Sequence, residues 1–193
     1  KENTVVFYYF IISKLKSVKP KEAIKHPKWK MGKKISIDSA TLMNKMFELI
    51  EAHKLFSISK KKIEIVIHPE SLVHAIVQFN NGLYKLIYHD TSMIIPLSNA
   101  IFDSKSNIDD FIQLKKKDIV FSNLNFLKVD KKRFPIINLK NRIIEHISTP
   151  IIINAANEIL VDQYLKKKLP FISIYKLILS VLRDRNYKKY AIK

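Results

Sequence analysis

Apolar residues recur at three- and four-residue spacing in the stretch that follows Asp38, which is the pattern of an amphipathic helix. The stripe consists of Leu42, Met43, Met46, Phe47 and Ile50. Asp38 or Ser39 stands where a short polar side chain caps the first helical turn. The sequence therefore predicts a helix that begins at Asp38 and faces a core with this stripe.

The polar residues of the same stretch are Thr41, Asn44, Lys45 and Glu48. They lie three or four apart, so an amide, an ammonium and a carboxylate project together from one side of the helix. With Ser39 and the unpaired N–H groups of a helix start, this face can hold a phosphate, and Glu48 can ligate a hard divalent metal. Spacing alone favours a simpler interpretation, an ordinary solvated face with a weak Lys45–Glu48 pair.

Residues 61–89 alternate between apolar and other residues with period two, which predicts strands over 63–67, 73–79 and 83–88. Asn80-Asn81-Gly82 separates the last two strands and indicates a hairpin with a tight primed turn. His68 and His74 flank the Pro69-Glu70 turn. Because these two histidines belong to different elements, they do not form a helical metal pair, and we interpret them as mainly structural.

The last third of the chain is predicted to be helical, with helices opening at Pro135, Pro150 and Pro170. The first helix should reach His146. Asn154, Asn157 and Glu158 in the second helix suggest a ligand site, but helix-to-loop hydrogen bonding within a helical bundle is the favoured interpretation. The predicted class is α+β: an antiparallel sheet packed with helices, followed by a helical region. We expect residues 1–125 to form the portion with the sheet and the candidate site, and residues 126–193 to form the helical region.

The formal net charge is +18, from 35 basic and 17 acidic residues. Only four of the basic residues are Arg, the lysines are scattered, and no basic-aromatic motif appears, so the pattern does not favour a dedicated nucleic-acid-binding module. Nonspecific polyanion binding at low salt would follow from the charge alone, and this alternative stays open. The chain has no cysteine, which excludes disulfides and thiolate metal sites. No apolar run reaches the roughly 18 residues of a membrane span.

Three stretches together resemble one enzyme family. They are HPKWKMGKKISIDSATLMNK from residue 26, IHPESLVH at 67–74 and NAANEI at 154–159. The family that they resemble is 1-deoxy-D-xylulose 5-phosphate reductoisomerase, and the resemblance runs in register from about Val18 to Val181. The family's amino-terminal dinucleotide-binding domain has no counterpart in the chain, and the helical region is expected to be truncated.

The resemblance implies conversion of 1-deoxy-D-xylulose 5-phosphate to 2-C-methyl-D-erythritol 4-phosphate in non-mevalonate isoprenoid biosynthesis. The implied cofactors are NADPH and a divalent metal, Mg²⁺ or Mn²⁺. It also implies a homodimer for the full-length enzyme, no membrane association, no specific nucleic acid, and the bacterial cytoplasm or a plastid-type organelle as the compartment.

The resemblance also assigns roles to residues. It implies substrate contacts for five residues: His26, Ser39, Asn44, Lys45 and Glu48. Lys45 and Glu48 are the implied catalytic pair, and Glu48 is the implied metal ligand. A lid is implied to include Trp29, Met31 and Met93, and Gly32 is implied to lie against the nicotinamide cofactor.

The chain also departs from the family pattern. The Gly-rich phosphate loop expected ahead of Pro20 is replaced by a sequence without glycine, and the acidic Asp-Ser-Glu motif that supplies two further metal ligands is absent. Because a hard divalent ion needs several charged oxygens, we expect the chain alone to be inactive. A degenerate, non-catalytic remnant of the enzyme is the main alternative.

Overall fold

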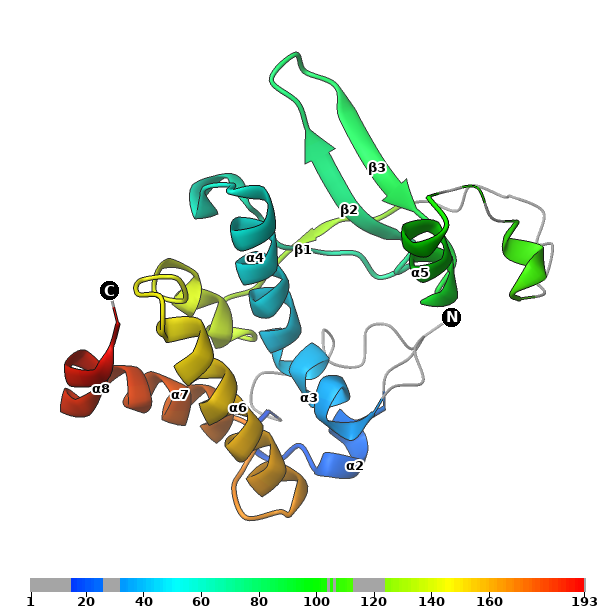
Figure 1. Cartoon of the computed structure of the whole chain (residues 1–193). Coiled ribbons are helices and arrows are strands. Elements are labelled where there is room, and N and C mark those ends of the chain that lie inside the picture. The colour runs from blue at the N-terminus through cyan, green and yellow to red at the C-terminus, as the bar shows by residue number, and fades with distance from the viewer. Residues whose placement is uncertain (1–14, 26–31, 104, 106, 113–123, 193) are drawn as a thin grey trace. The chain divides into compact units, whose positions relative to one another are not determined.

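The structure is a computed structural model that describes residues 15–25, 32–103, 105, 107–112 and 124–192. The chain forms two compact units. Unit 1 comprises Lys1–Val66 and Lys128–Lys193, and unit 2 comprises Ile67–Leu127. The elements of both are labelled in Figure 1.

Unit 1 is helical. Its elements are α2 (Pro20–Ala23), α3 (Lys33–Thr41), α4 (Met43–Phe56), the 3-10 helices η2 (Lys60–Lys62) and η4 (Pro135–Asn141), α6 (Thr149–Leu165), α7 (Ser173–Arg183) and α8 (Arg185–Tyr190). Helix α6 packs against α7 on one side and against α3 on another, while α4 packs against η4. Segments from both ends of the chain therefore build one helical body (Figure 1).

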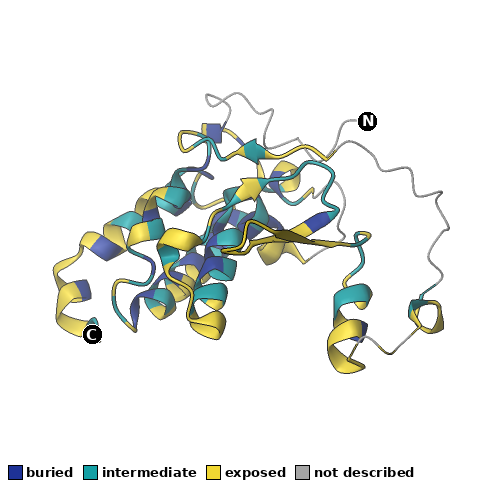
Figure 2. Cartoon of the chain, turned by 90° about the horizontal axis from the view of Figure 1, so that it is seen from above, coloured by how far each residue is buried: buried dark blue, intermediate teal, exposed yellow. Residues whose placement is uncertain are grey.

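The core of unit 1 joins the predicted apolar stripe to the carboxy-terminal helices. Met43, Met46 and Leu49 of α4 are buried, together with Ile153 of α6 and Ile178 of α7. Dark bands of buried residues mark the inner sides of these helices in Figure 2. The prediction that the stripe from Leu42 onward faces a core is confirmed.

The predicted helix start at Asp38 is wrong. The helix begins at Lys33 with Gly32 as its N-cap, and it ends at Thr41 because Leu42 adopts a left-handed conformation with φ of 62°. A second helix, α4, starts at Met43. Asp38 is a buried residue inside α3 rather than a cap, and Thr41 does not share a helix with Asn44, Lys45 and Glu48.

Unit 2 contains the predicted hairpin, with β2 (Val73–Gln78) antiparallel to β3 (Tyr84–Tyr88), followed by α5 (Ile94–Ile101) and η3 (Ile108–Asp110). The turn is not a primed one. Among Asn80, Asn81 and Gly82, only Gly82 has a positive φ, of 86°, and its N–H donates to the carbonyl of Phe79. This is a three-residue loop with glycine at the left-handed position.

The first predicted strand does not join the hairpin. It is reduced to β1 (Val66–Ile67), which pairs with β4 (Leu127–Lys128) where the chain passes between the two units. Ile63 and Ile65 instead pack against the helical core. The hairpin itself carries mostly exposed residues, which appear yellow in Figure 2.

The carboxy-terminal helices largely follow the prediction. Helix α6 begins one residue before Pro150, and α7 begins three residues after Pro170. The helix expected from Pro135 to His146 is instead the shorter 3-10 helix η4. The α+β class is confirmed, while the expected functional division at residue 125 stays a prediction. None of the helices in the described ranges is long and apolar enough to cross a membrane.

Candidate functional site

The polar face of α4 is a hydrogen-bonded cluster around one carboxylate. The amide Nδ2 of Asn44 donates to Oε1 of Glu48 over 2.9 Å. The ammonium of Lys45 lies 2.7 Å from Oε2 of Glu48. The side chains of Lys45 and Glu48 are 43% and 44% exposed, so both are open to a solute. The three residues predicted to project together do meet.

This cluster can exchange its internal contacts for contacts with a ligand. A half-exposed ion pair contributes only about 0 to 1 kcal/mol to stability, so little is lost when an anion takes the ammonium or a cation takes the carboxylate. Ser39 is half-buried in the last turn of α3 and precedes the cluster along the chain. The arrangement offers an ammonium and an amide donor beside a carboxylate that accepts.

The carboxylate of Glu48 fits a metal only as one ligand of several. Hard divalent ions are held by several oxygen ligands, and charged ones raise the affinity most. Within the residues that the structure describes, no group of three or more His, Asp or Glu side chains is placed to hold an ion. A complete metal site on Glu48 therefore requires carboxylates from outside these residues.

Gly32 stands at the N-cap of α3 with a φ of −61°, a conformation that any residue adopts. A Cβ added there would meet no described atom within 4 Å. Neither the backbone nor the packing of the described residues requires glycine at this position. No described residue blocks the approach of a bound group there.

Several predicted site residues cannot be compared with the cluster. His26, Trp29 and Met31 lie outside the described residues. Met93 belongs to unit 2 and is 56% exposed. The expected convergence of His26 with Ser39, Asn44 and Lys45, and the expected lid, stay predictions.

The two histidines of the IHPESLVH stretch have structural contacts within unit 2. Nδ1 of His68 lies 3.0 Å from Oε2 of Glu70 and 2.8 Å from the backbone carbonyl of Asn125. Partial burial raises the pKa of Glu70, but hydrogen bonds from Asn125 and the charge of His68 outweigh it and leave the pKa below its usual value. His74 stacks on His89, with ring centroids 3.7 Å apart. These contacts agree with a structural role for both histidines.

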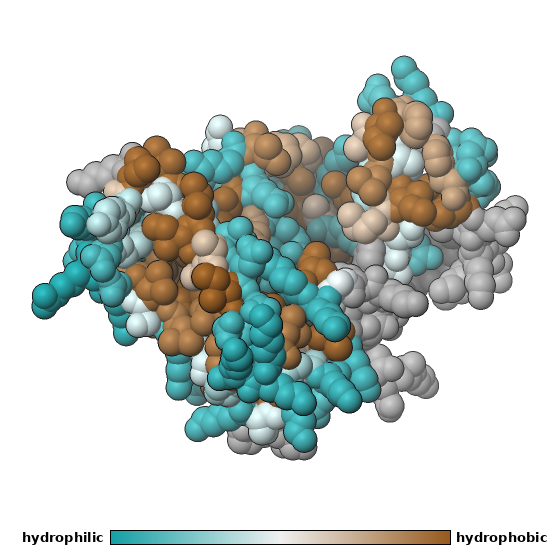
Figure 3. Space-filling view, turned by 60° about the horizontal axis from the view of Figure 1, so that its bottom comes forward, coloured by the Kyte–Doolittle hydropathy of each residue, from teal (hydrophilic) through white to brown (hydrophobic). Residues whose placement is uncertain are grey.

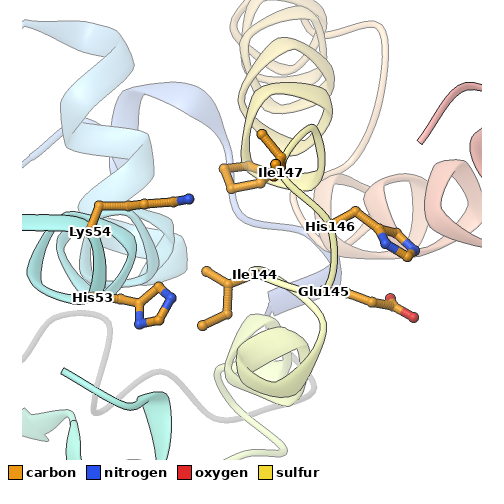
Figure 4. A pocket seen from close by; sticks show the side chains of 7 residues that line it. His53, Lys54, Ile144, Glu145, His146 and Ile147 are labelled. Atoms are coloured by element: carbon orange, nitrogen blue, oxygen red, sulfur yellow. The ribbon is translucent and has the colours of Figure 1, made fainter. Parts of the chain in front are cut away.

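A small cavity of about 150 Å³ lies at the carboxyl end of α4, and none of the predicted site residues lines it. His53 extends from α4 toward Ile144 and Lys54 toward Ile147, whereas Glu145 and His146 point away from α4 (Figure 4). The cavity offers two groups that can carry positive charge and no inward-pointing carboxylate. We assign it no role.

The structure contains a buried hydrogen-bonded pair of side chains that the sequence analysis does not predict, and one of the two residues lies a few positions before the cluster. Nδ2 of Asn157, in α6, donates to Oδ1 of Asp38, in α3, over 2.7 Å. The expected partner of Asn157 was a loop, so that detail is wrong: its partner is a helix. The sequence signal was a carboxylate and an amide at positions that the helical pattern turns toward the core.

Hydrophilic and hydrophobic surfaces are mixed on the face of the protein seen in Figure 3. Hydrophilic surface runs between hydrophobic patches on this face. A polyanion track requires clustered basic residues along one face or helix. Hydropathy does not show whether the lysines form such a track, and the expected absence of a specific nucleic acid stays a prediction.

Comparison with known proteins places the chain beside one group of enzymes. A family model described as "1-deoxy-D-xylulose 5-phosphate reductoisomerase C-terminal domain" matches residues 5–56. A second, "DXP reductoisomerase C-terminal domain", matches residues 90–192. The 1-deoxy-D-xylulose 5-phosphate reductoisomerase of Pelagibacter ubique is 44% identical over 181 residues, which are 93% of this chain and 46% of the relative.

Solved structures give the same result. A crystal structure of DOX-P reductoisomerase in complex with NADPH, fosmidomycin and magnesium aligns with a TM-score of 0.85 and 32% identity, over 97% of this chain and 46% of that one. The Zymomonas mobilis enzyme in complex with NADPH aligns with a TM-score of 0.81 and 30% identity, over 99% of this chain and 48% of that one. The chain thus spans about half the length of the proteins that it matches.

Proposed function

Because the chain belongs to the 1-deoxy-D-xylulose 5-phosphate reductoisomerase family, we propose that it is the catalytic and carboxy-terminal portion of such an enzyme. The activity proposed for the whole enzyme is conversion of 1-deoxy-D-xylulose 5-phosphate to 2-C-methyl-D-erythritol 4-phosphate. The observation that supports this proposal is the Asn44–Lys45–Glu48 cluster, which holds a carboxylate, an ammonium and an amide on one exposed helix face. Its compartment would be the bacterial cytoplasm or a plastid-type organelle.

The cluster would serve the substrate's two chemically different ends. Lys45 and Asn44, with Ser39 and His26, would bind a phosphate or hydroxyl oxygens through N–H and O–H donors. Glu48 would be one ligand of a Mg²⁺ or Mn²⁺ ion. Such an ion polarises carbonyl and hydroxyl oxygens, and NADPH supplies the hydride.

The remaining proposed roles concern the cofactor, a lid and the assembly of the whole enzyme. An approach of the nicotinamide to Gly32 is supported by the absence of described atoms within 4 Å of a Cβ added there. Trp29, Met31 and Met93 would form a lid that excludes water from the reacting atoms. A homodimer of the whole enzyme is supported by the exposed apolar residues of the hairpin, among them Leu83, Leu86 and Ile87.

The isolated chain should nevertheless be inactive. It should show no metal-dependent oxidation of NADPH with 1-deoxy-D-xylulose 5-phosphate, because Glu48 is the single carboxylate proposed for the metal and affinity grows with the number of charged ligands. Turnover that disappears with Glu48→Gln would contradict this part of the proposal. Glu51→Gln, on the same helix and exposed, is the matched control.

The whole-enzyme activity can be tested by completing the chain. The part of the Pelagibacter ubique relative that this chain does not match would be fused ahead of it. The fusion should turn over substrate, and Glu48→Gln should reduce kcat by at least about a hundredfold because one metal ligand is lost. A folded but inactive fusion would favour a degenerate remnant over a competent catalytic portion.

A further inference from the structure

Asp38 is a buried carboxylate held by two other side chains of unit 1. It is 2% exposed, and its Oδ1 accepts the 2.7 Å hydrogen bond from Asn157. Its Oδ2 lies 2.8 Å from the ammonium of Lys34, one turn earlier on α3. The carboxylate therefore ties α3 to α6, across 119 positions of sequence.

Stability alone does not explain this pair. Asn157 is completely buried, and its amide oxygen Oδ1 has no hydrogen-bond partner among the described residues. A buried polar atom without a partner costs about 1 to 3 kcal/mol, and apolar side chains of similar volume often replace buried charged groups without loss. The arrangement is better explained by the orientation that it imposes on α3.

The backbone of Asp38 holds the junction between α3 and α4. The hydroxyl of Thr41 donates to the carbonyl of Asp38 over 3.2 Å and accepts from the N–H of Met43 over 3.3 Å. Leu42 lies between them in its left-handed conformation. One residue thus anchors α3 to α6 through its side chain and takes part in the turn into α4 through its carbonyl.

We propose that Asp38 and Asn157 are positioning residues for the candidate site. Ser39 directly follows Asp38, and Asn44 and Lys45 directly follow Met43, so the junction sets the direction of the cluster relative to Ser39. This inference rests on the proposed function, in which Ser39, Asn44 and Lys45 share one phosphate. A site held in place before binding spends less free energy on ordering itself when the ligand arrives.

Asn157→Leu tests the proposal in the full chain, since leucine keeps the volume and removes the donor. The matched control is Tyr187→Phe, which removes a buried hydrogen bond of the same 2.7 Å length to Thr149, away from α3. Both variants should lose stability. Inorganic phosphate, titrated and followed by NMR at Asn44 and Lys45, should bind about tenfold more weakly to Asn157→Leu and unchanged to Tyr187→Phe.

A second variant covers the case in which Asn157→Leu does not fold. Thr41→Val is isosteric at a half-buried position and removes the hydroxyl that bridges Asp38 and Met43. Thr41→Val should weaken phosphate binding, as Asn157→Leu does. Equal affinities in wild type and Thr41→Val, or equal losses in Asn157→Leu and Tyr187→Phe, would overturn the proposal.

Amide hydrogen exchange separates this inference from the proposed function. Exchange at Met43, Asn44 and Lys45 should become faster in Asn157→Leu and Thr41→Val but not in Tyr187→Phe. Wild-type protein that binds no phosphate would contradict the assigned site, while the exchange rates would still decide whether Asp38 and Asn157 position the junction. Unchanged exchange in both test variants would overturn the positioning role.

Discussion

The phenol of Tyr164 donates a 3.0 Å hydrogen bond to the backbone carbonyl of Val18, and both residues are buried. This bond attaches the carboxyl end of α6 to the segment that precedes α2. Burial and the nearby negative charge of Glu22 raise the pKa of Tyr164 above its ordinary value of 10.0. The phenol therefore stays protonated in the folded protein at pH values where an unfolded chain loses the proton.

This pKa shift predicts a specific alkaline loss of stability. The contribution of Tyr164 is complete below the unfolded pKa of about 10 and declines as the pH rises toward the raised folded pKa. Tyr164→Phe should lose about 1 to 3 kcal/mol at neutral pH, since the Val18 carbonyl loses its partner, and should show a shallower decline above pH 10. Urea unfolding from pH 8 to 11 measures both. Tyr190→Phe, exposed in wild type, should match wild type throughout.

Truncation of Met46 in α4 should cause a large loss of stability. Its side chain is fully buried in the core of unit 1. Met46→Ala should reduce the free energy of unfolding by about 2 to 5 kcal/mol because it removes apolar contacts and leaves a cavity. Leu55→Ala, on the same helix with its side chain 76% exposed, should change it by less than about 0.5 kcal/mol. Similar losses in urea denaturation would mean that the α4 stripe does not face the core.

The two glycines should respond differently to alanine. Gly82 has a φ of 86°, so Gly82→Ala should destabilise the hairpin by about 1 kcal/mol. Gly32 has a φ of −61°, and an added Cβ would meet no described atom within 4 Å, so Gly32→Ala should cost only about 0.5 to 1 kcal/mol, because alanine is a poorer N-cap, and should leave β2 and β3 unaffected. Thermal unfolding and amide exchange in β2 and β3 provide the measurements. A loss well above about 1 kcal/mol for Gly32→Ala in the isolated chain would show that the chain's own packing, rather than a bound group, requires that glycine.

The lowered pKa of Glu70 predicts a loss of stability at acid pH. Because its folded pKa lies below the unfolded value, its contribution is present above the unfolded pKa and is lost as the pH falls through the folded pKa. Glu70→Gln should therefore flatten this part of the pH dependence, followed by amide exchange in unit 2 between pH 6 and 3. Glu145→Gln, at an exposed ion pair in unit 1, should leave the exchange of unit 2 unaffected. Equal acid sensitivity in Glu70→Gln and wild type would contradict the assignment.

The features predicted correctly from sequence are those with local causes. The hairpin follows from alternation on both sides of Gly82, and α6 follows from Pro150 and a long apolar periodicity. The Asn44–Lys45–Glu48 cluster was predictable because helical geometry brings residues three and four apart together.

The features that the sequence did not predict depend on partners far apart in the chain or on backbone conformations that the residue types do not indicate. Leucine rarely adopts the left-handed conformation, so nothing at Leu42 indicated that one apparent helix is two. The contact between Asp38 and Asn157 joins segments that no local pattern relates. The 3-10 geometry after Pro135 likewise could not be separated from an α-helix by the position of the proline.

The division of unit 1 into two chain segments has a consequence for synthesis on the ribosome. The hairpin of unit 2 needs only neighbouring residues and can pair as soon as Tyr88 has emerged. Met43 and Met46 must wait for Ile153 and Ile178, which are made much later. During that interval the apolar face of α4 is without its partners, which is the condition that favours aggregation and chaperone binding. Nascent chains halted before α6 should therefore be captured by chaperones, and release should coincide with the appearance of α7.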